Sequence, residues 1–354
     1  MAKKPSNTVK VGIIGAGIGA AHLAGYSAVP QAEVVAICDL NAERARAMAV
    51  AGGAPDVPIY SDYREMLEKA GVEAVSVGVP NAMHRPIAVD CLNAGKHVLS
   101  EKPLSTDARE GQKIADAAAK NNLKCMVGQV VRFRADSQFL KARIAAGDLG
   151  AIYYAHTGQL RRRGIPGFGG WFTTKAMSGG GPLIDIGVHM LDLAWWLCGC
   201  PRPLTVSGVT RAAFGPKGKG AGGYGAENKP QGTYDVEDFA AGFIRCEGGI
   251  TINLEVSCAI HNRQESQWCQ IFGDEGGGEW GSNTGIFRDV DGHPSILTPE
   301  IGGGDPWQGQ CSHFINSILN NTTPDPDVKQ GVQMMKMLDA IYKSADSGRE
   351  VVIK

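Results

Sequence analysis

Features that would point to a nucleic acid or a membrane are missing from this sequence. Its 35 lysines and arginines are balanced by 36 aspartates and glutamates, for a formal charge of −1, so no basic excess attracts a polyanion. No apolar run approaches the roughly 20 residues that a membrane span needs. The opening MAKKPSNTVK lacks the apolar core of a signal peptide. We therefore expect a cytoplasmic protein with no nucleic-acid and no membrane partner.

Paired cysteine motifs are also absent. The nine cysteines are an odd number and form no CxxC pair, which argues against a zinc knuckle and against a disulfide framework. Most of them stand inside apolar runs, where a thiol behaves as a small apolar group, and a reducing compartment is their simplest setting. No cluster of residues has the spacing of metal ligands, so we predict no metal site.

The sequence has neither an internal repeat nor a low-complexity tail, and what remains is the composition of an ordinary globular protein. Of its 354 residues, 43% are hydrophobic and 20% are charged. A chain of this length is expected to form two domains.

A glycine-rich turn follows the first predicted strand. Residues 9–14 (VKVGII) read as a buried strand, and GAGIGA at 15–20 leads from it into a helical segment. In this setting of strand, turn and helix, Gly15 permits the turn, Gly17 lets the backbone approach a pyrophosphate, and Ala20 allows close packing of helix and strand. The helix N-terminus favours the phosphates. We predict that Gly15, Gly17 and Ile18 bind a dinucleotide; the alternative is a glycine turn without a ligand.

An acidic residue ends the second predicted strand. Asp39 follows the strand at 34–38, about 20 residues beyond the glycines, where a carboxylate accepts hydrogen bonds from the adenosine ribose. It would repel a 2′-phosphate, so NAD is favoured over NADP. Arg44 is close enough in the sequence to weaken this preference.

The alternation of strands and helices continues to about residue 128. Further buried strands are predicted at 74–79, 97–100 and 123–127, and such alternation is typical of a parallel, doubly wound sheet. We therefore expect residues 1–128 to form a Rossmann domain. Ligands bind beyond the carboxyl ends of its strands, where the sequence places Pro80–His84 and Glu101–Pro103.

From residue 129 to 354 the pattern changes. Alternating strands joined by hairpins, one of them turning at 247–249, indicate an α+β domain with an open, mainly antiparallel sheet. An exposed sheet face is a plausible subunit interface. Two helices, predicted at 307–320 and 328–346, can pack back on the first domain.

One helix of this second domain is apolar on nearly every side. It runs from Pro182 to Leu197 and is interrupted by Asp185, His189 and Asp192, which lie on one stripe of a helix. A buried ionisable stripe needs a reason, because unpaired buried charge is costly. The alternative is that the stripe faces solvent.

These motifs together resemble the glucose–fructose oxidoreductase/inositol dehydrogenase (Gfo/Idh/MocA) family. The likeness rests on GAGIGA, PNAMH, EKP and GGGPLIDIGVHMLD and extends to the closing IYKSADSGREVVI. It implies NAD(P)-dependent oxidation or reduction of a sugar, cyclitol or related polyol, in a homodimer or homotetramer built through the open sheet face.

The resemblance also assigns residues. Lys102, Asp185 and His189 match the family's catalytic positions. Glu101 resembles the family residue near the nicotinamide ribose. In the segment 80–84, the resemblance assigns cofactor contacts to Pro80, Asn81 and His84. For Asn81, capping of a helix is an equal alternative.

The chemistry of alcohol oxidation is consistent with these residue types. The nicotinamide takes the hydride, and His189 has the ordinary pKa suited to taking the proton near neutrality. Asp185 can orient His189 or hold a neighbouring hydroxyl, and the Lys102 ammonium can stabilise a developing alkoxide. Whether Lys102 or His189 takes the proton is left open. A metal at Asp185, His189 and Asp192 would need a further ligand, which the sequence does not indicate.

Substrate contacts are expected between residues 160 and 172 (LRRRGIPGFGGWF). Arg161 and Arg163 supply donors for hydroxyls, and Trp171 supplies a flat apolar wall for a sugar ring. The alternative is a solvated basic loop. Arg132 stands at the domain junction, where it can serve either domain.

Three functions are consistent with the sequence. The first is an NAD-dependent dehydrogenase acting on a secondary hydroxyl of a sugar, cyclitol or glycoside. The second is a glycosidase or lyase of the same fold, in which tightly bound NAD oxidises a ring hydroxyl, a bond is eliminated and the ring is reduced again. The third is a non-catalytic NAD-sensing protein, which would have no need of a proton acceptor.

Overall fold

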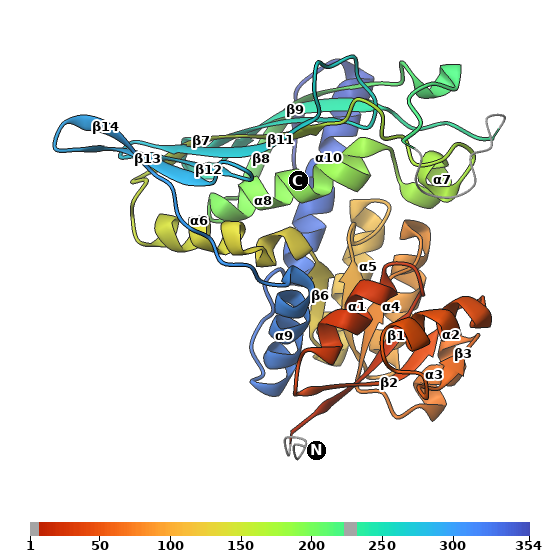
Figure 1. The fold of residues 1–354 in the computed structure, drawn as a ribbon. Coiled ribbons are helices and arrows are strands. Elements are labelled where there is room, and N and C mark those ends of the chain that lie inside the picture. Colours follow the sequence, from red (N-terminus) through yellow and green to blue (C-terminus); the bar gives the residue numbers. More distant parts are fainter. Residues whose placement is uncertain (1–6, 223–231) are drawn as a thin grey trace. The chain divides into compact units, whose positions relative to one another are not determined.

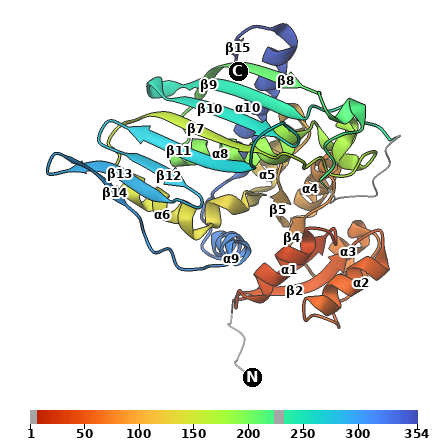
Figure 2. The same cartoon turned by 45° about the horizontal axis from the view of Figure 1, so that its top comes forward.

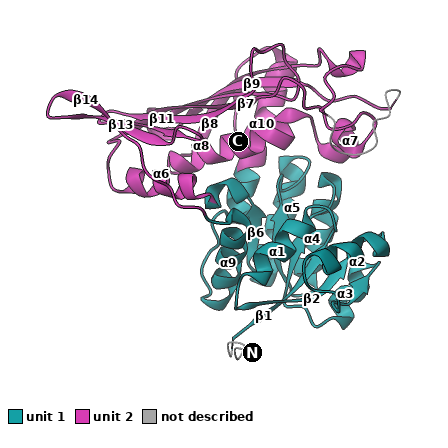
Figure 3. Cartoon of the chain, viewed as in Figure 1, with its two compact units in different colours: residues 1–133, 304–333 teal, residues 134–303, 334–354 magenta. Residues whose placement is uncertain are grey.

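The computed structural model describes residues 7–222 and 232–354 and divides the chain into two compact units (Figure 3). Unit 1 comprises residues 1–133 and 304–333, and unit 2 comprises residues 134–303 and 334–354. The boundary after residue 133 lies five residues beyond the expected one at 128. In addition, residues 304–333 return to the first unit, and the chain then ends in the second.

Unit 1 contains a six-stranded parallel sheet in the order β3-β2-β1-β4-β5-β6. This arrangement confirms the doubly wound sheet. The strand order reverses between β1 and β4, which is the point where such sheets bind ligands. The strands are β1 (Val9–Ile14), β2 (Ala32–Cys38), β3 (Ile59–Tyr60), β4 (Ala74–Val77), β5 (His97–Glu101) and β6 (Cys125–Gly128).

The helices of unit 1 differ in how they begin. The side chains of Asn41, Asp62, Asp107 and Asp305 accept a backbone N–H at the starts of α2, α3, α5 and α9. Helices α1 and α4 follow Ile18 and Met83 and have no side-chain cap from these residues. The helices are α1 (Gly19–Ser27), α2 (Ala42–Ala51), α3 (Tyr63–Lys69), α4 (His84–Asn93), α5 (Ala108–Asn121) and α9 (Pro306–Leu319), with short 3₁₀ turns η1 (Asn81–Met83) and η2 (Val130–Phe133).

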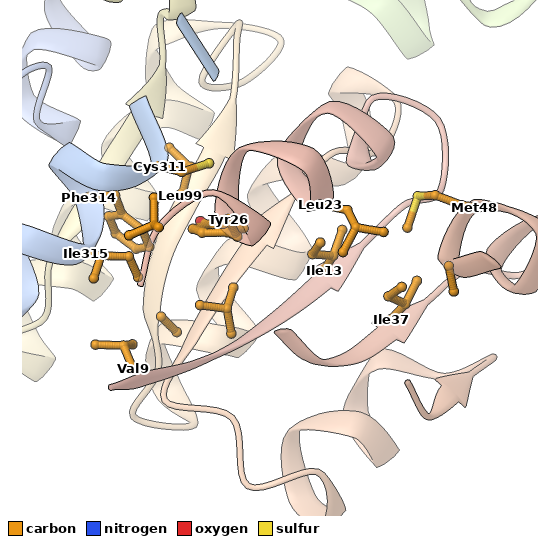
Figure 4. Packing of buried hydrophobic residues seen from close by; sticks show 14 of the residues in the cluster. Val9, Ile13, Leu23, Tyr26, Ile37, Met48, Leu99, Cys311, Phe314 and Ile315 are labelled. Carbon is orange, nitrogen blue, oxygen red and sulfur yellow. The ribbon is translucent and has the colours of Figure 1, made fainter. Parts of the chain in front are cut away.

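Helix α9 completes the core of unit 1 although it is distant in sequence. Phe314 and Cys311 of α9 are fully buried in one cluster with Ile13, Leu23 and Tyr26 (Figure 4). The two helices α1 and α9 meet at Gly25, where an added Cβ would lie 2.8 Å from the Trp307 carbonyl oxygen. The close approach therefore requires glycine at this position.

Replacing Gly25 with alanine is expected to destabilise the protein. Alanine favours a helix over glycine by about 1 kcal/mol, but overpacking at a contact with backbone costs about 1–3 kcal/mol. We expect the free energy of unfolding of Gly25→Ala, measured by chemical denaturation, to fall. A more stable variant would show that α1 and α9 can separate without cost.

Unit 2 contains a nine-stranded sheet in the order β14-β13-β12-β11-β7-β10-β9-β8-β15. Strands β7 and β10 pair in parallel and the other pairs are antiparallel, which confirms the mainly antiparallel sheet. The strands are β7 (Ile152–Leu160), β8 (Pro203–Arg211), β9 (Phe239–Cys246), β10 (Thr251–Ser257), β11 (Ser266–Gly273), β12 (Gly277–Trp280), β13 (Gly285–Val290), β14 (His293–Leu297) and β15 (Val351–Val352).

Helix α8 packs against β7, β10 and β11 on one face of this sheet (Figures 1 and 2). The Thr157 hydroxyl of β7 donates to the Met190 carbonyl of α8 over 3.2 Å. In the described part of the chain, no helix combines the length and apolar character needed to cross a bilayer. The helices are α6 (Ala135–Ala145), α7 (Lys175–Ser178), α8 (Val188–Leu197) and α10 (Val328–Ser347), of which α10 belongs to unit 2 from Met334 onward. Unit 2 also has a π turn η4 (Leu183–Gly187) and 3₁₀ turns η3 (Trp171–Thr173), η5 (Gly215–Lys217) and η6 (Glu247–Gly249).

Candidate active site

The glycine-rich turn of unit 1 follows β1 at the reversal point of the sheet. Gly15 has a φ of +100°, and a side chain there would overlap the Gly78 carbonyl, whereas a Cβ on Gly17 would meet open space. Gly19 packs closely on Ile13, where a Cβ would lie 2.9 Å from a methyl group. The position that needs a small residue for helix packing is therefore Gly19. The expectation for Ala20 is wrong, because Ala20 is exposed.

Asp39 is buried at the end of β2 and holds the glycine-rich turn. Its carboxylate accepts the N–H of Ala16 over 2.7 Å and of Asn41 over 2.8 Å, and it pairs with Arg44 at 2.6 Å. Burial opposes ionisation of Asp39, but these three donors outweigh it and lower the pKa of the carboxyl. A carboxylate has about four acceptor positions, so one remains for a ribose hydroxyl.

These observations fit a dinucleotide. Gly17 leaves room for the backbone to approach a pyrophosphate, the uncapped start of α1 offers N–H groups to it, and Asp39 is a buried acceptor at the expected distance in sequence. Ile18, which we expected in the cofactor site, is 41% exposed beside these groups.

His84 links the segments that follow β4 and β5. It is buried, with its ring nitrogens 2.8 Å from the Val79 carbonyl oxygen and 2.7 Å from that of Pro103. Burial lowers the pKa of His84, and the two carbonyl contacts oppose this. Helix α4 begins directly after the turn η1 (Asn81–Met83), and the Met83 side chain does not cap it. His84 ties the Pro80 segment to the turn that carries Lys102.

Glu101 is held by a residue that the sequence interpretation missed. The His22 Nε2 of α1 lies 2.9 Å from the Glu101 carboxylate, and both side chains are buried. The Lys102 N–H donates to the same carboxylate over 3.3 Å, and an added side chain on Gly128 would collide with it. In the sequence, His22 could have been noticed only as a polar residue at a position of α1 that is expected to be buried.

The apolar helix of unit 2 presents two polar side chains. Between residues 181 and 198, Asp185 and His189 alone are half-buried, and every other residue is buried, including Asp192 at 3% exposure. The expected single helix is divided, because Asp185 stands in the π turn before α8. Such turns cost stability and occur often at functional sites.

A buried carboxylate accepts the first N–H groups of this helix. Glu237 accepts from Gly181 over 2.9 Å and from Leu183 over 3.0 Å, and the Tyr342 hydroxyl donates to it over 2.9 Å. Burial raises the pKa of the Glu237 carboxyl, and these three donors oppose the rise. Each hydrogen bond to a charged group contributes about 1.5–3 kcal/mol. The sequence offered no signal for Glu237, because its partners lie about 55 residues before it and 105 residues after it.

The glycine run before the helix is occupied by protein. A side chain on Gly180 would overlap the Tyr342 hydroxyl, and one on Gly181 would overlap the Glu237 carbonyl. These glycines therefore allow α10 and the segment before β9 to approach the helix.

A small cavity lies beside Asp185 in unit 2. It measures about 20 Å³, enough for one water molecule, and its walls include Ile165, Phe172 and Tyr234. Trp171 stacks on Phe172 with ring centroids 3.7 Å apart, so it supports this wall. Neither of the expected arginines lines the cavity. Arg161 is half-buried at the end of β7 and Arg163 is exposed.

Arg132 has a structural role in place of the expected substrate contact. Its side chain is 1% exposed, and its guanidinium donates to Asp325 over 2.7 Å and to Gln330 over 2.8 Å within unit 1. Burial with these partners ties η2 to the returning segment 304–333.

Within residues 7–222 and 232–354, no three His, Cys, Asp or Glu side chains gather as a metal site. All nine cysteines are free, and eight of them are buried.

Comparison with known proteins identifies the family. Residues 9–129 match the oxidoreductase family with an NAD-binding Rossmann fold, and residues 137–279 match the GFO/IDH/MocA C-terminal domain. D-glucoside 3-dehydrogenase of Escherichia coli (strain K12) is 33% identical over 349 residues, which is 98% of each chain. The chain belongs to the GFO/IDH/MocA oxidoreductase family.

Other members share the fold and extend over nearly the whole chain. Levoglucosan dehydrogenase of Pseudarthrobacter phenanthrenivorans is 26% identical over 390 residues, covering 95% of this chain and 96% of the relative. A structure of levoglucosan dehydrogenase with NADH and levoglucosan has a TM-score of 0.87 at 24% identity, covering 98% of this chain and all of the other. The GFO/IDH/MocA resemblance and the NAD-binding Rossmann fold expected from the sequence are thereby confirmed.

Removing the Asp39 charge is expected to weaken NAD⁺ binding. Asp39→Asn loses a charged acceptor contributing about 1.5–3 kcal/mol, so the Kd measured by calorimetry should rise about tenfold or more. Preference for NAD⁺ over NADP⁺ should fall as well, because Arg44 is released and the repelling charge is gone. Asp62→Asn, which alters the exposed cap of α3, is the control. An unchanged Kd for Asp39→Asn would contradict the ribose contact.

Proposed function

We propose that this protein is an NAD-dependent dehydrogenase that oxidises a secondary hydroxyl of a sugar, cyclitol or glycoside, with D-glucosides as the first candidates. The observation that carries the proposal is the exposure pattern of the apolar helix, where only Asp185 and His189 escape burial between residues 181 and 198. The 33% identity to a D-glucoside 3-dehydrogenase over 98% of the chain supports the substrate class.

The catalytic roles follow from the residue chemistry. When bound, NAD⁺ supplies the hydride acceptor. His189 or Lys102 takes the hydroxyl proton, and a histidine is suited to this near neutral pH. Asp185 orients His189 or accepts a hydrogen bond from a neighbouring substrate hydroxyl. The Lys102 ammonium stabilises the negative charge that develops on the reacting oxygen.

Residues around Lys102 fit a positioning role. His22 holds the Glu101 carboxylate, and His84 binds the carbonyl oxygen of Pro103, which follows Lys102. We assign Glu101, Pro80 and Asn81 to the cofactor and His84 to the support of the Lys102 turn. Preorganised charges of this kind lower the barrier without reorganisation during the reaction.

The substrate pocket is assigned to the region around Asp185. Trp171 and Phe172 provide a flat apolar wall of the kind that packs against a sugar ring. Arg161 and Arg163, half-buried and exposed, supply donors for hydroxyl groups that extend from this wall.

A substrate screen tests the activity. Purified protein is incubated with polyols, free sugars and alkyl or aryl glucosides together with NAD⁺ or NADP⁺, and both NADH absorbance and product identity are followed. We expect stoichiometric NADH and a keto product. Release of an aglycone without net NADH would instead indicate the glycosidase mechanism, and no turnover with any substrate would contradict the proposal.

Two variants test the assigned residues. Lys102→Ala and His189→Ala are each expected to lower kcat about 100-fold or more, as the loss of a proton-transfer group does, while the Kd for NAD⁺ changes little. Lys113→Ala, which removes an exposed lysine from α5, is the control. Unchanged turnover in both site variants would rule out this mechanism.

We further propose that the protein forms a homodimer or homotetramer through the sheet face opposite α8. Aromatic side chains gather there, with Tyr154 stacked on Phe272 and His156 edge-on to Trp268, and aromatic residues are enriched at interfaces. Light scattering should give a multiple of 37.4 kDa for the wild type and a smaller assembly for Trp268→Glu. A monomeric wild type would contradict the proposal.

A further inference from the structure

We propose that Glu237 and Tyr342 are positioning residues that hold the π turn carrying Asp185 in its reactive geometry. The expected effect on turnover rests on the proposed function, whereas the anchoring of the π turn rests on contacts within unit 2. The Glu237 carboxylate and the Tyr342 hydroxyl that donates to it form the Glu237–Tyr342 clamp.

At the start of the helix, the backbone N–H groups between residues 181 and 185 have acceptors within unit 2. The N–H groups of Ile184 and Asp185 donate to the Gly181 carbonyl over 3.1 Å and 3.0 Å, and Pro182 has no N–H. The N–H groups of Gly181 and Leu183 remain, and both donate to the Glu237 carboxylate. A helix start normally leaves such donors to a side-chain cap or to water, but here the turn is buried and has no side-chain cap of its own.

Tyr342 fixes the carboxylate from the other side. It belongs to α10, its hydroxyl donates to the oxygen of Glu237 that accepts from Leu183, and the ring stands against Gly180. The Lys175 ammonium lies 5.5 Å from the ring centroid of Tyr342. The clamp therefore connects α10 with the first turn of the helix through one carboxylate.

The segment that carries Glu237 is itself anchored beside the same turn. Asp235 accepts the Lys175 N–H over 2.6 Å, and the Asp235 N–H donates to the Thr173 carbonyl over 3.2 Å. The Glu237 carbonyl packs directly on Gly181. The carboxylate thus has little freedom to move away, and Asp185, two residues after Leu183, takes its position from that anchor. A misplacement of a reacting group by 1 Å can cost a factor of about 100 in rate.

Two variants test the clamp. Glu237→Gln keeps the side-chain length but places an NH₂ group against one of two N–H donors, and Tyr342→Phe removes only the hydroxyl. Each has a matched control. Asp238→Asn alters the neighbouring buried carboxylate, which accepts the N–H groups of residues 213–215. Tyr63→Phe removes a tyrosine–carboxylate bond in unit 1, where the Tyr63 hydroxyl donates to Asp90 over 2.6 Å.

Hydrogen–deuterium exchange by mass spectrometry is measured together with steady-state kinetics and NAD⁺ affinity. In Glu237→Gln we expect faster exchange over residues 179–187 and a kcat lowered about tenfold to 100-fold, with the Kd for NAD⁺ unchanged. Tyr342→Phe should show both effects more weakly. Adding Tyr342→Phe to Glu237→Gln should have no further effect, because residues that act through one bond are not additive. The controls should leave exchange over 179–187 at the wild-type level.

Unchanged exchange over residues 179–187 in Glu237→Gln would overturn the inference, and so would faster exchange with an unchanged kcat. If Glu237→Gln does not fold, Tyr342→Phe decides by the same two measurements. If the wild type oxidises no sugar with NAD⁺, the proposed function fails, and the exchange data alone then decide whether the clamp holds the turn.

Discussion

The first turn of the helix that carries Asp185 and His189 is buried, and a buried N–H without an acceptor costs about 1–3 kcal/mol. The Glu237 carboxylate meets this constraint for Gly181 and Leu183. Other features of unit 2 depend on that solution. The carbonyl of Glu237 leaves no room for a side chain at Gly181, and Tyr342 must reach the same carboxylate from α10. The glycine run and the last helix are thus parts of one arrangement.

The start of helix α1 in unit 1 differs from the start of the helix in unit 2. Helix α1 has no side-chain cap, and Gly17 faces open space, so its first N–H groups are available to a ligand. The helices α2, α3 and α5 of the same unit are capped by their own side chains. The N–H groups at the start of α1, where the sheet order reverses, therefore have no side-chain acceptor from the cap position, whereas those of Gly181 and Leu183 in unit 2 donate to the Glu237 carboxylate.

Sequence was sufficient where the partners of a residue are near it in the chain. The turn at Gly15 and Gly17 and the buried carboxylate of Asp39 were predictable because a strand, a tight turn and a second strand follow one another between Val9 and Asp39, an arrangement typical of dinucleotide-binding folds. It was insufficient for Gly25, whose constraint comes from Trp307, and for Glu237, whose partners come from two distant segments. The error at Ala20 has a similar origin, because the phase of α1 on the sheet brings Gly19 against Ile13.

A polar residue in an apolar helix or strand can be enclosed and support the fold, or it can reach the surface. The sequence alone does not distinguish these two cases. Arg132 and His22 are both enclosed, one paired with Asp325 and the other with Glu101, whereas Asp185 and His189 reach the surface of a helix that is otherwise buried. Pattern alone placed Arg132 with the substrate and overlooked His22. The difference lies in burial, because Arg132 and His22 are fully enclosed, whereas Asp185 and His189 are half-buried. Enclosed pairs of this kind hold the fold. Asp185 and His189 are half-buried on a helix whose other residues are buried, and for this reason we propose them, and not Arg132 or His22, for the proton-transfer site.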